Sequence, residues 1–151
     1  MQQFILDLKD DQRPIIKLEK WKNMNALLDT GAVFPVWLAK EELLVKPGAT
    51  LKKENITFGG FKEKAVGNLY ILPSFVLGAL VFPNFHIIAC ENDRIPAHMI
   101  VSATMFRNLS YEINDKTKHL TVTIPDGESN IRNLVIKSTD GISYVFCNSA
   151  E

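Results

Sequence analysis

The sequence has little that would assign it at once to several common classes of protein. Lysine and arginine total 17, and aspartate and glutamate also total 17, so the chain has no basic excess of the kind that nucleic-acid-binding domains usually carry. No apolar run approaches the roughly 20 residues that a membrane-spanning helix needs. The N-terminal residues reach a charged side chain, Asp7, too soon to contain the apolar core of a signal peptide. We therefore expect a soluble cytoplasmic protein that binds neither nucleic acid nor membrane.

Cysteine and histidine are also scarce. Cys90 and Cys147 are far apart and lie in no Cys-x-x-Cys motif, so we expect two free, buried thiols rather than a disulfide. His86, His98 and His119 have no ligand-like spacing to one another or to the cysteines, which argues against a zinc site. The sequence contains no Walker loop and no dinucleotide-binding fingerprint. It therefore predicts neither a metal nor a cofactor.

The chain does contain a long succession of short apolar segments separated by turn residues. Its 151 residues fit one domain, and a hydrophobic fraction of 46% suffices for a packed core. The predicted strands span residues 4–8, 15–18, 26–28, 56–58, 65–70, 75–80, 85–90, 109–113, 119–124, 131–136 and 142–146. Short helices are predicted at residues 37–44 and 102–108, the second with Ser102 as N-cap, and Asn23 and Asn25 suit a hairpin turn. This pattern predicts an all-β fold, either a barrel or a sandwich.

One segment is a candidate for chemistry. Residues 26–32 read Ala-Leu-Leu-Asp-Thr-Gly-Ala, so that a short apolar strand leads directly into Asp29. The tripeptide Asp-Thr-Gly alone is a weak signal, because all three residues favour turns at strand ends. A small residue after the glycine, and an apolar pattern that resumes at residues 35–37, distinguish this segment from an ordinary turn. The Asp-Gly pairs at residues 126–127 and 140–141 lack these flanks and are interpreted as hairpin turns.

With these flanks, residues 26–32 resemble the active-site signature of the retropepsin-like aspartic proteases, and the bacterial branch of that family is the closer likeness. Residues 56–60, Ile-Thr-Phe-Gly-Gly, are similar to the family's flap, a glycine-tipped hairpin that closes over the substrate. Residues 98–106 resemble the segment that packs behind the active site. The likeness extends over residues 4–124 in order and spacing. It implies a closed β-barrel with one or two short helices, in a single domain that spans residues 1–151.

The resemblance also implies a role for each residue of the candidate site. Asp29 would supply a catalytic carboxylate, and Thr30 would brace the two active-site loops against each other at a subunit boundary. Gly31 would let the backbone approach the carboxylates closely, where a side chain would obstruct it, and Ala32 would complete the loop. The flap residues that would close over a substrate are Phe58, Gly59, Gly60 and Phe61.

Acid–base hydrolysis of this kind needs two carboxylates that share a proton, and the chain has one such motif. The chain is also too short for a two-lobed enzyme. We therefore expect a symmetric homodimer in which Asp29 from each chain meets on the twofold axis. The implied activity is that of an aspartic endopeptidase, which hydrolyses a peptide or protein substrate through an activated water. The alternatives are a catalytically inactive module of the same fold, used for dimerisation or peptide binding, and an unrelated β-barrel binding protein that would be a monomer.

Two features depart from the family pattern. Ser102 stands where the family usually has glycine and adds bulk behind the active site. Val33 and Phe34 occupy places that are acidic in retroviral enzymes, so the ion pair of those enzymes is not carried over to Arg107. Residues 125–151 extend beyond the minimal retroviral length, and they either add strands to a dimer interface or fold back on their own subunit.

Overall fold

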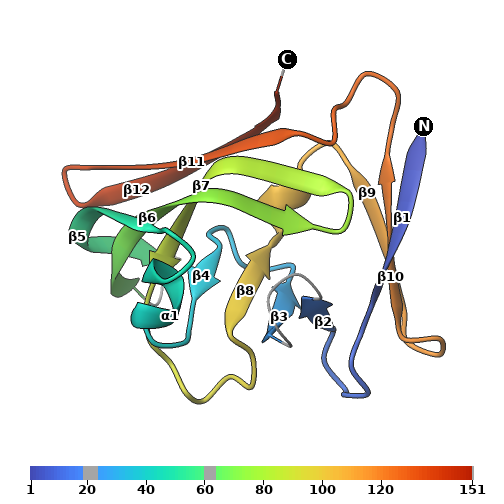
Figure 1. Cartoon of the computed structure of the whole chain (residues 1–151), viewed down its shortest axis with the longest axis horizontal. Helices are drawn as coiled ribbons and strands as arrows, with labels where there is room; N and C mark the ends of the chain where they lie inside the picture. Colours follow the sequence, from blue (N-terminus) through green and yellow to red (C-terminus); the bar gives the residue numbers. More distant parts are fainter. Residues whose placement is uncertain (19–23, 60–63, 151) are drawn as a thin grey trace.

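The computed structural model describes residues 1–18, 24–59 and 64–150. Within these ranges the chain is almost wholly β-structure, with one α-helix and one 3-10 helix of four residues each, which confirms the all-β prediction (Figure 1). The elements, in chain order, are β1 (Gln2–Asp7), β2 (Ile15–Leu18), β3 (Met24–Asp29), β4 (Val36–Trp37), α1 (Glu42–Val45), β5 (Thr50–Gly59), β6 (Lys64–Leu77), β7 (Leu80–Ala89), β8 (Met99–Ser102), η2 (Ala103–Phe106), β9 (Ser110–Asn114), β10 (His119–Ile124), β11 (Arg132–Thr139) and β12 (Ile142–Ser149).

The strands form three separate sheets, so the closed β-barrel is a wrong prediction for the described residues. The largest sheet has seven strands in the order β2-β3-β8-β4-β7-β6-β5, and the others are β1-β10-β9 and β11-β12. A closed barrel requires its first and last strands to pair, but β2 and β5 lie at opposite ends of the seven-stranded sheet. Register irregularities between Leu51 and Ile56 bend β5. The sheet therefore does not close on itself, although Leu8 and Lys9 bridge the outer edge of β2.

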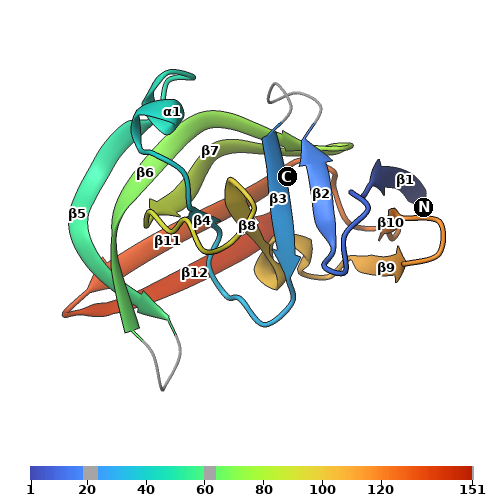
Figure 2. The same cartoon turned by 90° about the horizontal axis from the view of Figure 1, so that it is seen from below.

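The centre of the seven-stranded sheet determines where the candidate loop begins. β3 and β8 are parallel neighbours (Figure 2), with Asp29 opposite Ser102. β4 then pairs with β8 on one side and with β7 on the other. Such strands carry apolar residues because neighbouring elements cover them, and Ala26, Leu28 and Val101 are buried here. Packing on these residues fixes the point at which β3 ends.

The helix predicted for residues 37–44 is wrong in its first half. Val36 and Trp37 form β4 instead, and α1 is confined to Glu42–Val45. Trp37 is fully buried, and its indole N–H donates a hydrogen bond to the carbonyl oxygen of Lys40 (3.0 Å). The apolar segment 36–38 thus lies between two strands of a buried sheet, and this tertiary environment overrides helix propensity.

Two other predicted elements differ from the structure. Asn25 lies within β3 rather than in a turn, and Asn23 lies outside the described residues. The strand predicted for residues 75–80 is interrupted, because β6 and β7 meet in a turn at Gly78, whose φ is +59°. A Cβ at this position would stand only 2.4 Å from the ring of Phe4. Both the backbone conformation and the available space therefore require glycine at this turn.

The C-terminal hairpin, β11–β12, folds back on its own chain. β11 packs on β7, and the amide of Val81 donates a hydrogen bond to the carbonyl oxygen of Asn130 (2.9 Å). Figure 1 shows the hairpin lying across β6 and β7. β12 also contacts β5 and η2. Of the two arrangements expected for residues 125–151, the described chain therefore adopts packing on its own subunit.

Both cysteines are free thiols, as expected. Cys147 is buried and Cys90 is half-buried, so the expectation of burial is met fully at one position and partly at the other. Burial raises the pKa of each thiol. Neither thiol therefore has the lowered pKa of a reactive cysteine.

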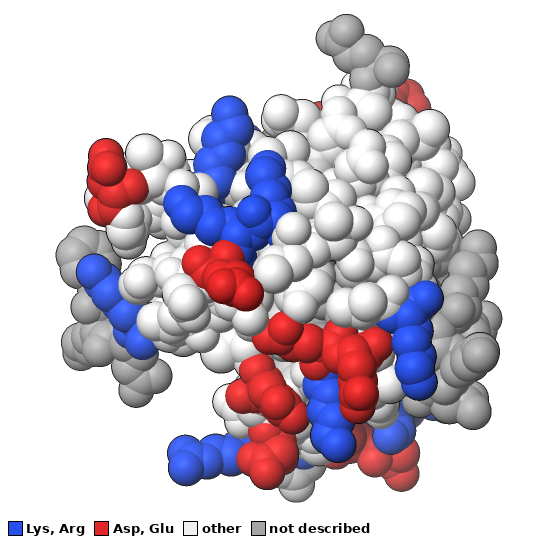
Figure 3. Space-filling model, turned by 60° about the vertical axis from the view of Figure 1, so that its left-hand side comes forward, with Lys and Arg blue, Asp and Glu red and all other residues white. Residues whose placement is uncertain are grey.

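The surface carries both signs of charge in close proximity. On the face shown in Figure 3, basic and acidic side chains lie near one another along the left and lower parts, and a broad area at the upper right carries no charge. The charged side chains of the described residues on that face are therefore of mixed sign. Among the helices of the described ranges, none has the length and apolar character needed to cross a membrane.

Candidate active site

Asp29 is the last residue of β3, and its own hydrogen bonds define the loop that follows. The amide of Gly31 donates to Asp29 Oδ1 (3.0 Å), and the amide of Ala32 donates to the Asp29 carbonyl oxygen (3.1 Å). These two bonds turn the chain tightly at the end of the strand, so that the carboxylate is half-buried rather than fully enclosed. Oδ1 of the carboxylate is therefore engaged by the backbone of its own loop.

The rest of the loop faces solvent within one chain. Thr30 and Gly31 are exposed, and Ala32 is half-buried. A Cβ at Gly31 would lie 3.5 Å from Asp29 Oδ1, which is an ordinary van der Waals distance. Within one chain a Cβ at Gly31 would therefore be accommodated, and the role of Gly31 in letting backbone approach a pair of carboxylates stays a prediction. Val33 is apolar but 51% exposed, so the loop presents an uncovered apolar residue beside Asp29.

The Asp29 carboxylate is hydrogen-bonded to no other carboxylate among the described residues. Among the described residues, its only side-chain hydrogen bond is the one it accepts from Gly31. The same residues contain no group of three histidine, cysteine, aspartate or glutamate side chains that could hold a metal ion.

Ser102 lies directly behind this loop and is fully buried. Its hydroxyl oxygen is 2.7 Å from the hydroxyl oxygen of Thr104, and Thr104 in turn donates to the carbonyl oxygen of Val33 (2.6 Å). Ser102 has the extended backbone of an N-cap residue (φ −87°, ψ 155°), but its side chain makes no capping hydrogen bond to η2. The predicted cap is therefore correct in position and wrong in its interaction. Sequence reasoning overlooked Thr104, although a second hydroxyl two residues after Ser102 was a visible signal.

The β5–β6 hairpin supplies the segment that resembles a flap. Phe58 is half-buried, and its ring meets that of Phe34 edge-on, with centroids 6.0 Å apart. Gly59 ends β5 with a φ of +120°. Gly60 and Phe61, the predicted tip, lie outside the described residues. The described part of the hairpin is therefore linked by an aromatic contact to the loop that follows Asp29.

The C-terminal hairpin, β11–β12, also contacts β5. The Ser143 hydroxyl donates to the carbonyl oxygen of Thr57 (2.6 Å), and Lys53 Nζ donates to the carbonyl oxygen of Ser138 (3.1 Å). A small pocket lies between the two hairpins, next to Gly59 and Ile142. These contacts restrain β5 near its glycine end.

Arg132 connects the C-terminal hairpin to the rear of the site, and sequence reasoning also overlooked it. The side chain is fully buried. Its Nε donates to the carbonyl oxygen of Met105 (3.2 Å), and its Nη2 donates to that of Arg107. Its Nη1 lies 3.6 Å from a carboxylate oxygen of Glu128. The guanidinium therefore satisfies carbonyl groups at the end of η2, where a helix leaves its last acceptors without partners.

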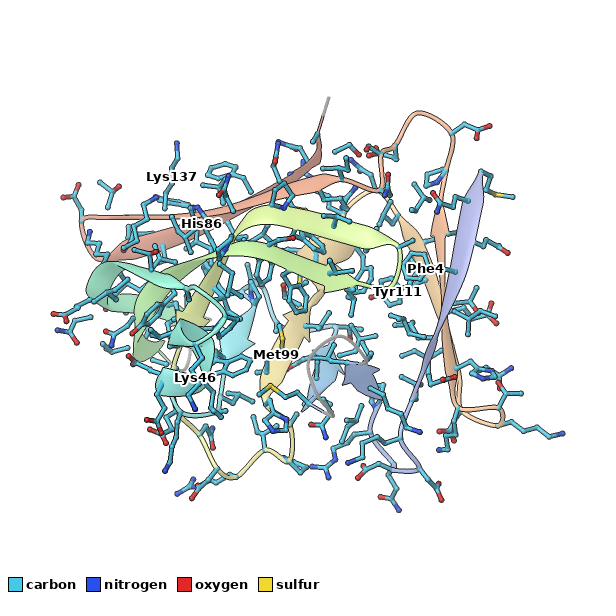
Figure 4. The ribbon with its side chains drawn as sticks, viewed as in Figure 1. Phe4, Lys46, His86, Met99, Tyr111 and Lys137 are labelled. Carbon is cyan, nitrogen blue, oxygen red and sulfur yellow. The ribbon has the colours of Figure 1, made fainter. Side chains whose placement is uncertain are left out.

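His86 is also a buried polar residue, and it joins β7 to β11 (Figure 4). The amide of Ile136 donates to His86 Nδ1 (2.9 Å), and the same nitrogen is 3.3 Å from the Ile136 carbonyl oxygen. The shorter contact assigns Nδ1 as an acceptor, so the neutral ring carries its proton on Nε2. Burial lowers the pKa of His86, which favours this neutral form.

A lowered histidine pKa makes stability depend on pH in a defined direction. The unfolded chain takes up the proton more readily than the folded chain, so the contribution of His86 is complete above about pH 6.5 and is lost as the pH falls through the lower pKa of the folded state. We expect His86→Gln, which cannot titrate, to lose less stability than the wild type between about pH 7.5 and about pH 5. Urea unfolding at both pH values measures this difference. Equal losses in the two proteins would show that protonation of His86 is not coupled to folding.

Comparisons with known proteins address the fold. No protein-family model matches the chain, and no curated protein matches it. Among solved structures, the chain is similar to the crystal structure of a retropepsin-like aspartic protease from Rickettsia conorii. The TM-score is 0.51 at 16% sequence identity, over 80% of this chain and 89% of that chain. This similarity supports the resemblance at the level of the fold and leaves the activity open.

Proposed function

We propose that the protein is an aspartic endopeptidase that is active as a homodimer, with one catalytic Asp29 from each subunit. The observation that carries this proposal is the state of Asp29. Its carboxylate is held by the Gly31 amide at the end of β3, is half-open to solvent, and has no other carboxylate bonded to it among the described residues. The fold in which it stands is similar to that of an aspartic protease.

The chemistry follows from bringing two such carboxylates together. Two carboxylates in close contact cannot both be ionised cheaply, so they share one proton and titrate as a pair, as in aspartic proteases generally. The ionised member accepts a proton from a bound water, whose oxygen attacks the peptide carbonyl carbon. The protonated member donates its proton to the developing oxyanion. As the tetrahedral intermediate collapses and the C–N bond breaks, the carboxylate that took the water's proton gives it to the departing amine nitrogen. The other carboxylate takes back a hydroxyl proton of the intermediate, which restores the shared-proton pair.

A homodimer is the simplest source of the second carboxylate. A residue near a twofold axis automatically lies near its own copy. Thr30, Gly31 and Val33 are exposed in one chain, and a partner subunit at this loop would cover them. In this arrangement Thr30 would brace the two loops, and Phe58 and Gly59, with the hairpin tip at Gly60 and Phe61, would close over a peptide or protein substrate.

Cleavage of a peptide library across a range of pH tests the proposal. We expect cleavage to be blocked by a statine-type mimic of the tetrahedral intermediate, because such compounds bind a paired-aspartate site far more tightly than substrates do. The same compound is expected to raise the melting temperature of the protein, since ligands that bind only the folded state stabilise it.

Two results would contradict the proposal. A monomer at micromolar concentration in sedimentation experiments, with or without the statine-type mimic, would remove the source of the second carboxylate. A dimer that binds the mimic but cleaves no peptide would indicate a peptide-binding module of the same fold.

A further inference from the structure

We propose that Ser102 and Thr104 are positioning residues for Asp29, acting through a relay of two hydroxyl groups that holds the loop after β3 from behind. This inference rests on the proposed function, because it assigns these residues a role in catalysis. The loop is braced at successive carbonyl groups. Ala103 N–H donates to the Ala32 carbonyl oxygen (3.3 Å), and the Thr104 hydroxyl donates to the Val33 carbonyl oxygen (2.6 Å).

The direction of the relay follows from counting protons. A threonine hydroxyl has one proton to donate, and that of Thr104 goes to Val33. In the 2.7 Å contact between the two hydroxyls, Ser102 must therefore be the donor. The chain of donors thus runs from Ser102 through Thr104 to the loop. A hydroxyl that both donates and accepts is polarised by each bond, which strengthens the other.

The relay also accounts for two properties of Ser102. Its hydroxyl is committed to Thr104, which explains why it makes no capping bond to η2. The bulk that serine adds behind the site is fully buried and carries a satisfied polar group. Because Asp29 and Ser102 are directly opposite in the parallel pair of β3 and β8, the relay begins beside the residue that it positions.

Three substitutions separate positioning from general stability. Thr104→Val keeps the shape of the side chain but removes its proton, so we expect kcat and kcat/KM to fall together by about 10-fold. Thr104→Ser restores the donor and is expected to recover most of the loss. Ser102→Ala leaves the bond to Val33 and is expected to cost less than Thr104→Val. Thr121→Val, at a half-buried threonine of β10 remote in sequence from the relay, is the matched control.

Two further measurements, the pH–rate profile and amide hydrogen exchange, report on the distance between the carboxylates and on the rigidity of the loop. The gap between the two apparent pKa values of the pH–rate profile reports how strongly the Asp29 pair is coupled. We expect Thr104→Val to narrow this gap, whereas a variant that is only less stable would leave it unchanged. Amide exchange of residues 29–37 is expected to accelerate in Thr104→Val and to return toward the wild-type rate in Thr104→Ser.

The outcomes for the relay and for the proposed function are distinguishable. If Thr104→Val matches Thr121→Val in kcat, pH profile and exchange, the relay is overturned while the protease proposal stands. Faster exchange with unchanged kcat would likewise overturn the positioning role. If the wild-type chain cleaves no peptide, the proposed function is overturned, and the exchange rates alone decide whether the relay holds the loop.

Discussion

Replacing Asp29 by asparagine is expected to lower peptide cleavage by about 10⁴-fold while leaving the fold intact. Asparagine has nearly the same shape as aspartate, and its Oδ1 can still accept the Gly31 amide that now binds the carboxylate at 3.0 Å. It cannot accept a proton from water at the pH of the reaction. The loss is therefore expected in kcat, with unchanged circular dichroism and an unchanged melting curve.

The same substitution tests whether the active unit is a dimer. The wild-type pair shares one proton and keeps one negative charge, whereas the pair of asparagines carries none, so we expect the variant dimer to be at least as stable as that of the wild type. When the two proteins are mixed in equal amounts and allowed to exchange subunits, about one quarter of the dimers contain two wild-type chains. Relative to wild-type protein at the same total concentration, we expect the activity of the mixture to be one quarter rather than one half.

A matched control guards against effects of charge alone. Asp115 lies in the exposed turn between β9 and β10 and pairs only with Lys118 among the described residues. We expect Asp115→Asn to cleave at the wild-type rate. Retained cleavage by Asp29→Asn would overturn the assignment of the catalytic residue, and a loss of one half in the mixing experiment would point to independent subunits.

Arg132→Met is expected to have the largest effect on stability, a loss of about 3 kcal/mol in the free energy of unfolding. Methionine fills the buried space but cannot donate to the carbonyl oxygens of Met105 and Arg107, which the guanidinium now binds. The substitution also removes one partner of Glu128, which is partly exposed and still accepts a hydrogen bond from the Ser149 hydroxyl. The costly part is the buried Met105 carbonyl oxygen, because a buried acceptor that loses its donor is left unsatisfied.

Two further variants define what Arg132 contributes. Arg132→Lys keeps the charge but loses the planar fork that reaches several acceptors at once, so we expect a smaller loss. Arg13 is also ion-paired, with Asp11, but it is exposed, and Arg13→Met is expected to cost much less than Arg132→Met. Urea unfolding compares all three. A loss for Arg132→Met no greater than that for Arg13→Met would show that the buried guanidinium contributes nothing beyond an arginine on the surface.

The sequence predicted well those features that depend on neighbouring residues. The hairpin of β9 and β10 was found nearly to the residue, because apolar alternation and a run of turn residues lie side by side in the chain. The same local logic identified β2 and, as residues 56–58 and 65–70, only parts of β5 and β6, and it placed Asp29 at the end of a strand. Features that depend on distant partners were missed. The local pattern around Trp37 predicted a helix, but Trp37 lies in β4, which pairs with β7 and β8, two strands remote in sequence.

The features of the candidate site also separate into those that depend on neighbouring residues and those that depend on distant partners. The sequence by itself predicted that Asp29 begins a turn at the end of a strand and showed that potential metal ligands have no regular spacing. It also showed a serine, Ser102, where the family that the chain resembles usually has glycine. Only the tertiary structure decided that Ser102 has a partner in Thr104, that the seven-stranded sheet stays open, and that the C-terminal hairpin secures η2 through Arg132. The physical reason is that each of these depends on a hydrogen bond or a strand pairing whose partner is set by packing. Turn propensity and apolar alternation act within a few residues and contain no information about which distant carbonyl a buried hydroxyl or guanidinium will meet.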